Sequence, residues 1–278
     1  MATLEHARKL SGLAMVAAAL WAGASAAETV AVRYTEGALR GFLVIRTLDD
    51  KVLADGEVTQ TVKGDRVTAR LVFRFKDGST HEETTVYSQR GQIQLISDHL
   101  VQKGPSFPQP VDMTVDAGGQ VTVHYKDDKG AMKTATDQFD ATPELANGIV
   151  PKMLANGGPD AMPRSLALMA ATPTPRMVKL QISAAGMERF TVGGSPREAM
   201  HYVLKVEIGG VAGVLAPIVG KQPPDSHVWI SNGEVPLFVR AEQPFYAGGP
   251  VWRIELASPT WPKPATAKAN DGKRKPPA

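Results

Sequence analysis

Apolar side chains alternate with polar ones from Glu198 to Ile208, and this period of two constrains the fold more than any other feature of the sequence. Five large side chains take every second position: Met200, Tyr202, Leu204, Val206 and Ile208. Successive side chains of a β-strand point to opposite faces, so these five share one face. The pattern predicts a strand of an antiparallel sheet with one buried face and one solvated face.

The N-terminal half contains four more strand-like segments, separated by turns rich in Asp and Gly. They span Phe42–Leu48, Val52–Val62, Arg66–Phe75 and Thr80–Gln89. The third has the clearest apolar face, made of Val67, Ala69, Leu71, Phe73 and Phe75. We expect an antiparallel meander, in which Arg74 lies opposite Glu82 as a cross-strand charge pair.

Short strand-like segments continue along the chain. They are Ile93–Leu100, Met113–Asp116, Val121–Lys126, Met132–Phe139, Ser165–Ala171, Met177–Ser183 and Phe190–Val192. So many strands do not form a flat sheet, because strands twist and large sheets curl, close or split into a sandwich. The sequence therefore predicts a mainly β fold, and we expect residues 27–261 to form one domain.

One segment carries the signals of a helix. Thr142 is a suitable N-cap, Pro143 suits the first helical position, and Glu144 suits the N-terminal end of the dipole. Four apolar residues follow at helical spacing on one side: Leu145, Ile149, Met153 and Leu154. We expect Pro151 to kink or break this helix and Gly157–Gly158 to end it.

Asn232–Gly233 lies between two apolar-rich runs and is a strong signal for a β-hairpin. Pro236 cannot donate a ladder hydrogen bond, which favours a four-residue loop, Ser231–Glu234, over a two-residue loop. One hairpin face would then be aliphatic, with Val228, Ile230, Val235, Leu237 and Val239. The other would be mixed, with His227, Trp229, Pro236 and Phe238.

The order of these C-terminal elements resembles a known family. An alternating strand precedes the hairpin HVWISNGEVPLFVRAE, a Gly-Gly turn and the strand VWRIEL. This order resembles an exported bacterial family catalogued as a domain of unknown function, through the Trp, the turn and the Pro of its C-terminal hairpin. It is also similar, more distantly, to the LolA and LolB lipoprotein carriers.

The resemblance implies a curved antiparallel sheet that forms an incomplete, half-open β-barrel with one or two short covering helices. It also implies that the concave apolar side holds an acyl chain or another hydrophobic ligand. The glycine-rich insert Gly209–Gly220 departs from the carriers, which leaves the identity of the ligand open.

That insert has twelve uncharged residues, four of them glycine. Its apolar side chains could fill the core of the sheet, cover a ligand cavity as a lid, or contact a membrane or a partner. Our candidates for ligand contact are Val211, Val214, Leu215 and Ile218 of the insert, with Leu145, Ile149, Met153 and Trp229.

Residues 1–26 have the order of a secretory signal peptide. Arg8 and Lys9 precede the apolar stretch Leu10–Gly23 and the small residues Ala24–Ala26. We expect cleavage after Ala26 and a periplasmic or secreted protein without a transmembrane anchor in the mature chain. The sequence has no cysteine, so no lipidation site follows the signal peptide.

The basic balance of the chain, +3 overall, comes from its C-terminal tail. Residues 262–278 are rich in Pro, Ala and Lys, and we expect this tail to be disordered. The remaining body is slightly acidic and has no basic stripe. Nucleic acid is therefore not an expected partner.

The sequence contains no motif of a known catalytic site. No serine lies in a G-x-S-x-G elbow, and His81-Glu82-Glu83 lacks the second histidine of a zinc helix. The histidines are isolated in sequence and are interpreted as a group as surface residues: His81, His99, His124, His201 and His227. Acidic pairs such as Asp49-Asp50 and Asp127-Asp128 fall in turns, where Asp is common for backbone reasons. We expect no catalytic residue, no metal and no cofactor.

These observations favour an exported, non-enzymatic protein that binds a hydrophobic or lipid-like ligand in the cell envelope. The alternative is an envelope interaction or scaffold module, in which the same apolar surface meets a partner protein. A secreted hydrolase is a third hypothesis, which requires a polar cleft with a carboxylate or histidine pair within hydrogen-bond reach.

Overall fold

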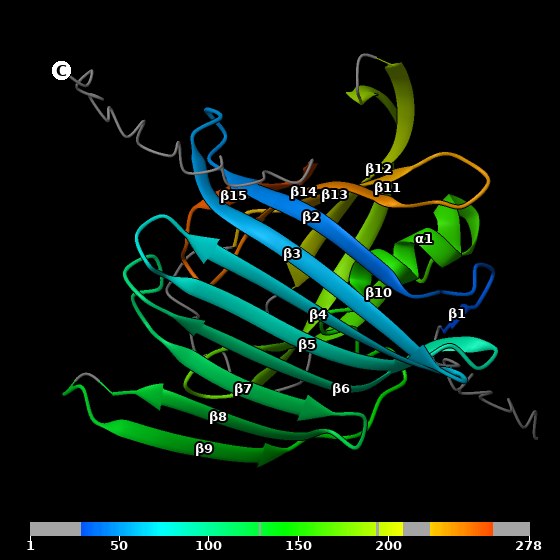
Figure 1. The fold of residues 1–278 in the computed structure, drawn as a ribbon. Helices are drawn as coiled ribbons and strands as arrows, with labels where there is room; N and C mark the ends of the chain where they lie inside the picture. The colour runs from blue at the N-terminus through cyan, green and yellow to red at the C-terminus, as the bar shows by residue number, and fades with distance from the viewer. Residues whose placement is uncertain (1–28, 128, 193–194, 208–222, 258–278) are drawn as a thin grey trace, which may run out of the picture.

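The computed structural model describes residues 29–127, 129–192, 195–207 and 223–257 (Figure 1). Within these ranges fifteen strands belong to one antiparallel sheet, accompanied by the helix α1 (Val150–Ala161). The predicted mainly β fold, with a curved sheet that stays open, is confirmed. Among the described residues, no helix is both long enough and apolar enough to cross a membrane.

The strands follow the chain in short, mostly hairpin-linked steps. The first eight are β1 (Val30–Ala31), β2 (Leu39–Arg46), β3 (Val52–Lys63), β4 (Arg66–Phe75), β5 (Thr80–Ser88), β6 (Gln92–Lys103), β7 (Val111–Asp116) and β8 (Gln120–Lys126). The others are β9 (Met132–Gln138), β10 (Ser165–Ala170), β11 (Arg176–Val192), β12 (Ser195–Glu207), β13 (Ser226–Ser231), β14 (Phe238–Pro244) and β15 (Val251–Ala257).

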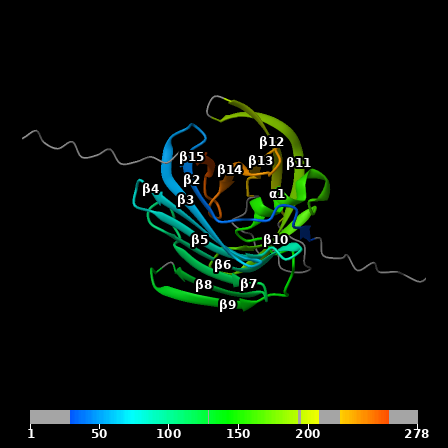
Figure 2. The same cartoon turned by 45° about the vertical axis from the view of Figure 1, so that its right-hand side comes forward.

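The sheet runs in the order β10-β11-β12-β13-β14-β15-β2-β3-β4-β5-β6-β7-β8-β9, and β1 adds to β6 outside this path. β15 pairs with β2, so the last strand of the chain joins its two halves. The two edges, β9 and β10, are not paired with each other. Figures 1 and 2 show the sheet curving so that α1 lies on its concave side.

The concave side, which we call the inner face, carries the hydrophobic core. Its largest fully buried side chains include Ile45, Phe73, Tyr87, Ile93, Met113 and Tyr202. α1 contributes Met153 and Leu154 to the same cluster. The alternation predicted for Glu198–Ile208 is confirmed within β12, because Tyr202 and Leu204 are buried. Burial of apolar area on this one face is the main driving force for the fold.

The segment before α1 crosses the interior and covers one sheet edge. Ala146 N donates to Ala167 O (2.9 Å), and Ala167 N donates to Glu144 O (3.0 Å), so the segment pairs with β10. Gly148 then packs against Thr85 with a positive φ of 67°. A Cβ at this position would collide with the Thr85 hydroxyl, so only glycine fits here.

The predicted start of the helix is wrong. α1 begins at Val150, whereas Thr142 accepts a 3.3 Å hydrogen bond from Glu144 N in a local turn. Pro151 lies in the first helical turn, where its missing N–H has no helical partner to lose, so it does not break the helix. The helical geometry is interrupted at Gly158 (φ 63°) instead, and Pro159 follows.

The predicted hairpin loop is also wrong. β13 ends at Ser231 and β14 begins at Phe238, so the connection spans residues 232–237 and includes Pro236. Ser231 N donates to Leu237 O at 2.8 Å, and Leu237 N donates to Ser231 Oγ at 3.0 Å. The serine side chain thus helps to close a longer loop, and Pro236 avoids the ladder altogether.

This longer loop changes the composition of the hairpin faces. Val228 and Ile230 are buried in the core as expected. Val235 and Leu237, expected beside them, are 56% and 59% exposed in the loop. The predicted aliphatic face is therefore wrong for these two residues. Phe238, predicted on the face of Trp229, lies opposite Ile230 instead and packs against the core.

Two further strand predictions need correction. Arg74 lies opposite Thr80 rather than Glu82, because β4 and β5 meet through the tight turn at residues 76–78. Glu82 pairs with Arg70 instead, at 2.7 Å. The segments Met177–Ser183 and Phe190–Val192 are one strand, β11, with a register shift between Ala184 and Gly186.

Three predictions lie outside the described residues. They concern the signal peptide (residues 1–26), the whole insert Gly209–Gly220 with its four candidate residues, and the tail (residues 262–278). They remain predictions from the sequence.

Candidate functional site

A row of neighbouring residues crosses the middle of the inner face. The registers place Val58 beside Leu71, Leu71 beside Glu83, and Glu83 beside Leu100. Val58, Leu71 and Glu83 are half-buried, whereas His81 and Thr85, the inner-face neighbours of Glu83 on β5, are buried. Solvent therefore reaches the inner face at Glu83, between the buried positions of His81 and Thr85.

Glu83 is an acidic side chain in this otherwise apolar row. Protein surrounds it closely enough that desolvation raises the pKa of its carboxyl to about 8, and the nearby Asp98 adds to this rise. None of the ion pairs between described residues involves Glu83. The carboxyl thus holds a proton at neutral pH unless a cation reaches it.

Asp98 lies diagonally across from Glu83 on the same face, because β6 pairs it with Thr85. It is 1% exposed, and its Oδ1 accepts a 2.7 Å hydrogen bond from the Thr85 hydroxyl. Its Oδ2 is buried and has no hydrogen-bond partner. Desolvation raises the pKa of Asp98 to about 6, although the Thr85 hydrogen bond opposes this rise. We call Glu83 and Asp98 the interior carboxyl pair.

An aromatic cluster closes the interior on one side of the pair. It consists of Phe73, Phe75, His81, Phe107, Phe245, Tyr246 and Trp252. Gln102 Nε2 lies 3.0 Å from His81 Nδ1 and donates to Phe245 O at 2.8 Å. Burial lowers the pKa of His81 to about 4, so this imidazole is neutral at physiological pH.

A second set of polar contacts ties residues 33–36, the N-terminal arm between β1 and β2, to α1 and the sheet. Lys152 of α1 forms a 2.9 Å ion pair with Glu36. Gln60 Nε2 donates to Glu36 Oε2 at 3.0 Å, and the Tyr87 hydroxyl donates to Gln60 Oε1 at 3.4 Å. Asn156 Oδ1 accepts hydrogen bonds from two backbone N–H groups of this arm. These contacts close the interior on the side of α1.

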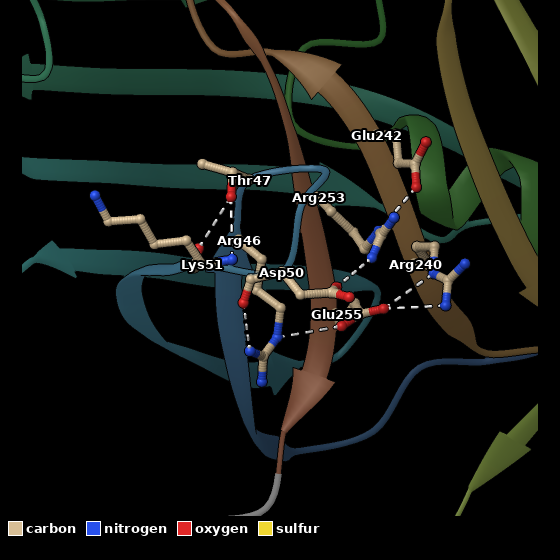
Figure 3. A network of polar contacts seen from close by, with 8 residues as sticks. All are labelled: Arg46, Thr47, Asp50, Lys51, Arg240, Glu242, Arg253 and Glu255. Atoms are coloured by element: carbon tan, nitrogen blue, oxygen red, sulfur yellow. Dashed lines mark hydrogen bonds and ion pairs between the residues drawn. The ribbon is translucent and has the colours of Figure 1, made fainter.

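The outer face carries a charged network where the two halves of the chain meet (Figure 3). Arg253 contacts Glu242 and Asp50, each at 2.8 Å. Glu255 accepts from Arg240 at 3.0 Å and lies 3.6 Å from Arg46. Each of the three arginines has an acidic partner, so the network stabilises the β14–β15–β2 junction.

A histidine cluster extends the outer face from this network. His201 stacks on Trp229, with ring centroids 4.4 Å apart, and its Nε2 lies 2.9 Å from His227 Nδ1. Glu188 lies 2.8 Å from His201 Nδ1 and accepts from Trp229 Nε1 at 2.8 Å. The interpretation of His201 and His227 as isolated residues is therefore wrong. Each of these four side chains has a polar or stacking partner within the cluster, as in a network that stabilises the fold.

The candidate residues from the sequence do not gather at one site. Leu145, Ile149 and Met153 are at most 2% exposed and fill the core beneath the sheet. Trp229 is 9% exposed and belongs to the outer face. Val211, Val214, Leu215 and Ile218 lie outside the described residues. Within the described part of the chain, no group of three or more acidic or histidine side chains could hold a metal ion.

The interior carboxyl pair was missed, although a signal was present. Glu82 was expected on the outer face, and strand alternation then places Glu83 on the inner face. Sequence alone does not show that Asp98 lies beside it, because a register shift between Val86 and Tyr87 sets the pairing of β5 with β6.

The sequence matches no protein-family model and no curated protein. Among solved structures, the chain is similar to a beta-barrel-like protein of domain of unknown function DUF1849 from Brucella abortus. The identity is 12% and the TM-score is 0.45, over 82% of this chain and 97% of that chain. The similarity to LolA and LolB carriers remains a prediction from the hairpin sequence.

Proposed function

We propose that this chain is an exported, non-enzymatic protein that shelters a hydrophobic or lipid-like ligand inside its curved sheet. The observation that carries this proposal is the half-buried row Val58, Leu71 and Glu83 on the inner face, where Glu83 lies between the buried His81 and Thr85 of β5. Aliphatic side chains inside a concave fold are normally covered. A ligand would cover these.

The energetics favour an apolar occupant. Removing apolar surface from water contributes about 25 cal/mol per Å². An acyl chain that lies along Val58 and Leu71 would therefore be stabilised by burial of its own surface and of theirs. Within the described residues the sheet stays open, because its edge strands β9 and β10 are not paired with each other. The aromatic cluster and α1 bound the region on two sides, as expected for a ligand site with apolar walls.

Export is supported by the sequence of residues 1–26, which predicts a cleavable signal peptide and a periplasmic or secreted location. Intact-mass measurement of the protein from its native cells tests this directly. A mature chain that begins at Ala27 is expected. A chain that retains residues 1–26 would contradict export by cleavage.

Leu71→Trp tests the proposed ligand site, because the indole would occupy the inner face beside Val58 and Glu83. Binding of a fluorescent fatty acid analogue is expected to weaken at least about tenfold, the equivalent of 1.4 kcal/mol. The matched control is Arg70→Trp, which adds the same group to the outer face of the same strand. Equal binding by both folded variants would refute the interior site.

An interaction module remains a second candidate because of the 232–237 loop. Val235 and Leu237 are both more than half exposed in this loop, and a partner protein that covered both would bury their apolar surface. The double substitution to serine should then abolish co-purification of an envelope protein without affecting the fatty acid analogue. Retention of that partner by the double variant would refute the module.

A further inference from the structure

The interior carboxyl pair is incompletely satisfied by the protein. Asp98 Oδ2 is buried without a hydrogen-bond donor, although a buried carboxylate oxygen normally has one. Glu83 lies diagonally across from it on the same face and is only half-buried. The pair therefore offers a ligand the half-buried carboxyl of Glu83 and the partnerless Oδ2 of Asp98.

The residues around the pair supply few counter-charges. Leu71, Leu100 and the backbone of Gly148 are its neighbours on β4, β6 and the segment before α1. His99 follows Asp98 on β6 and lowers the pKa of Asp98, but it lies 2.9 Å from Asp112, its own acidic partner. Lys152, a cation of α1, is already paired with Glu36. No ion pair between described residues includes Glu83 or Asp98.

The protonation of the pair fits a singly charged guest. Burial raises the pKa of both carboxyls, to about 8 for Glu83 and about 6 for Asp98, so the pair holds protons more strongly than free carboxyls do. A cation beside the pair favours its ionised form in this apolar setting. A second negative charge nearby would be strongly disfavoured.

We propose that Glu83 and Asp98 bind the protonated amine of an amphiphilic ligand, whose apolar tail lies along Val58, Leu71 and Leu100. This inference rests on the proposed function and names the chemical class of its ligand. An ammonium group supplies three donors, which satisfy Glu83 and the bare Oδ2 of Asp98 after a small side-chain rotation. An anionic head group would be repelled by Asp98.

Three probes with the same ten-carbon tail separate the head group from the tail. Decylamine is cationic, decanol is neutral and decanoate is anionic at neutral pH. Isothermal titration calorimetry, below the micelle concentration of each probe, gives their affinities for the wild-type protein. We expect decylamine to bind at least about tenfold more tightly than decanoate.

Matched variants identify the carboxyl that is responsible. Glu83→Gln should weaken decylamine at least about tenfold and leave decanol unchanged. Glu82→Gln changes the adjacent carboxyl on the outer face and should affect neither probe. Asp98→Asn keeps an acceptor for the Thr85 hydroxyl and provides a second test if Glu83→Gln does not fold.

The outcomes separate this inference from the proposed function. Equal affinity for all three probes, or tighter binding of decanoate, would overturn the amine site and leave the hydrophobic site intact. Equal effects of Glu83→Gln and Glu82→Gln would also overturn it. If none of the probes binds, both the amine site and the proposed function fail.

Discussion

Glu83→Gln should remove part of the pH dependence of the free energy of unfolding. Below pH 4.5, the ordinary pKa of glutamate, the carboxyl is protonated in the folded and the unfolded chain alike. Between pH 4.5 and about 8, the folded chain keeps a proton that the unfolded chain has lost. Stability from Glu83 is therefore full at low pH and is lost as the pH rises through 8. Glutamine does not titrate and removes this loss.

The size of the effect follows from the pKa shift. A rise from 4.5 to about 8 corresponds to at most about 5 kcal/mol, since one pKa unit is about 1.4 kcal/mol. Glu83 keeps part of its surface in solvent and shares its titration with Asp98. We therefore expect the free energy of unfolding of the variant to gain about 2–3 kcal/mol over wild type across this range.

Urea unfolding of both proteins at about pH 5.5 and about pH 8.5 measures this difference. Glu82→Gln is the control, because Glu82 lies on the outer face and pairs with Arg70 in solvent. Its pH dependence should follow wild type within about 0.5 kcal/mol. If Glu83→Gln also follows wild type, Glu83 is not desolvated and the account of the inner face is wrong.

Three other predictions concern stability. Gly148→Ala should lower the free energy of unfolding by about 2–4 kcal/mol in urea titrations, because the backbone has a positive φ here and the added Cβ would collide with Thr85. A loss below about 0.5 kcal/mol would contradict this packing. The pKa of His81 is lowered from 6.5 to about 4. The neutral imidazole therefore contributes folding stability that is present above pH 6.5 and is lost as the pH falls to about 4. His81→Phe should reduce acid unfolding, measured by circular dichroism, and an unchanged acid midpoint would refute the buried neutral imidazole. Arg253→Met should destabilise by about 1–2 kcal/mol, against about 0–0.5 kcal/mol for Arg40→Met at the exposed pair with Glu57, and equal losses would argue against the junction network.

The strands of the meander could be predicted because one buried face imposes a period of two. β4 begins and ends where the pattern of Arg66–Phe75 indicates. Turn sequences with Asp and Gly set the boundaries of its neighbours, because they favour the backbone of tight turns. Local signals were sufficient here because adjacent strands are also adjacent in the sheet.

Local signals failed where a distant contact decides the conformation. Thr142 and Pro143 have the features of a helix start, but the segment after them pairs with β10 and passes Thr85 at Gly148. The helix forms only after that crossing. Likewise, Pro236 was placed in a strand, whereas the side chain of Ser231 closes a longer loop around it.

The site could be predicted only in part. The alternation of β5 places Glu83 on the inner face, but its solvent access depends on which residues the curved sheet and the aromatic cluster cover. The apolar residues expected to contact the ligand, such as Ile149 and Met153, are instead buried in the core. Sequence periodicity identifies a buried face without showing which part of it remains open.

Native mass spectrometry of the protein, purified gently from the cells that produce it, tests the central claim most directly. We expect one apolar ligand per chain that is released by organic extraction and is absent from Leu71→Trp. A wild-type protein that carries no ligand, and takes up none of the three ten-carbon probes, would contradict the account.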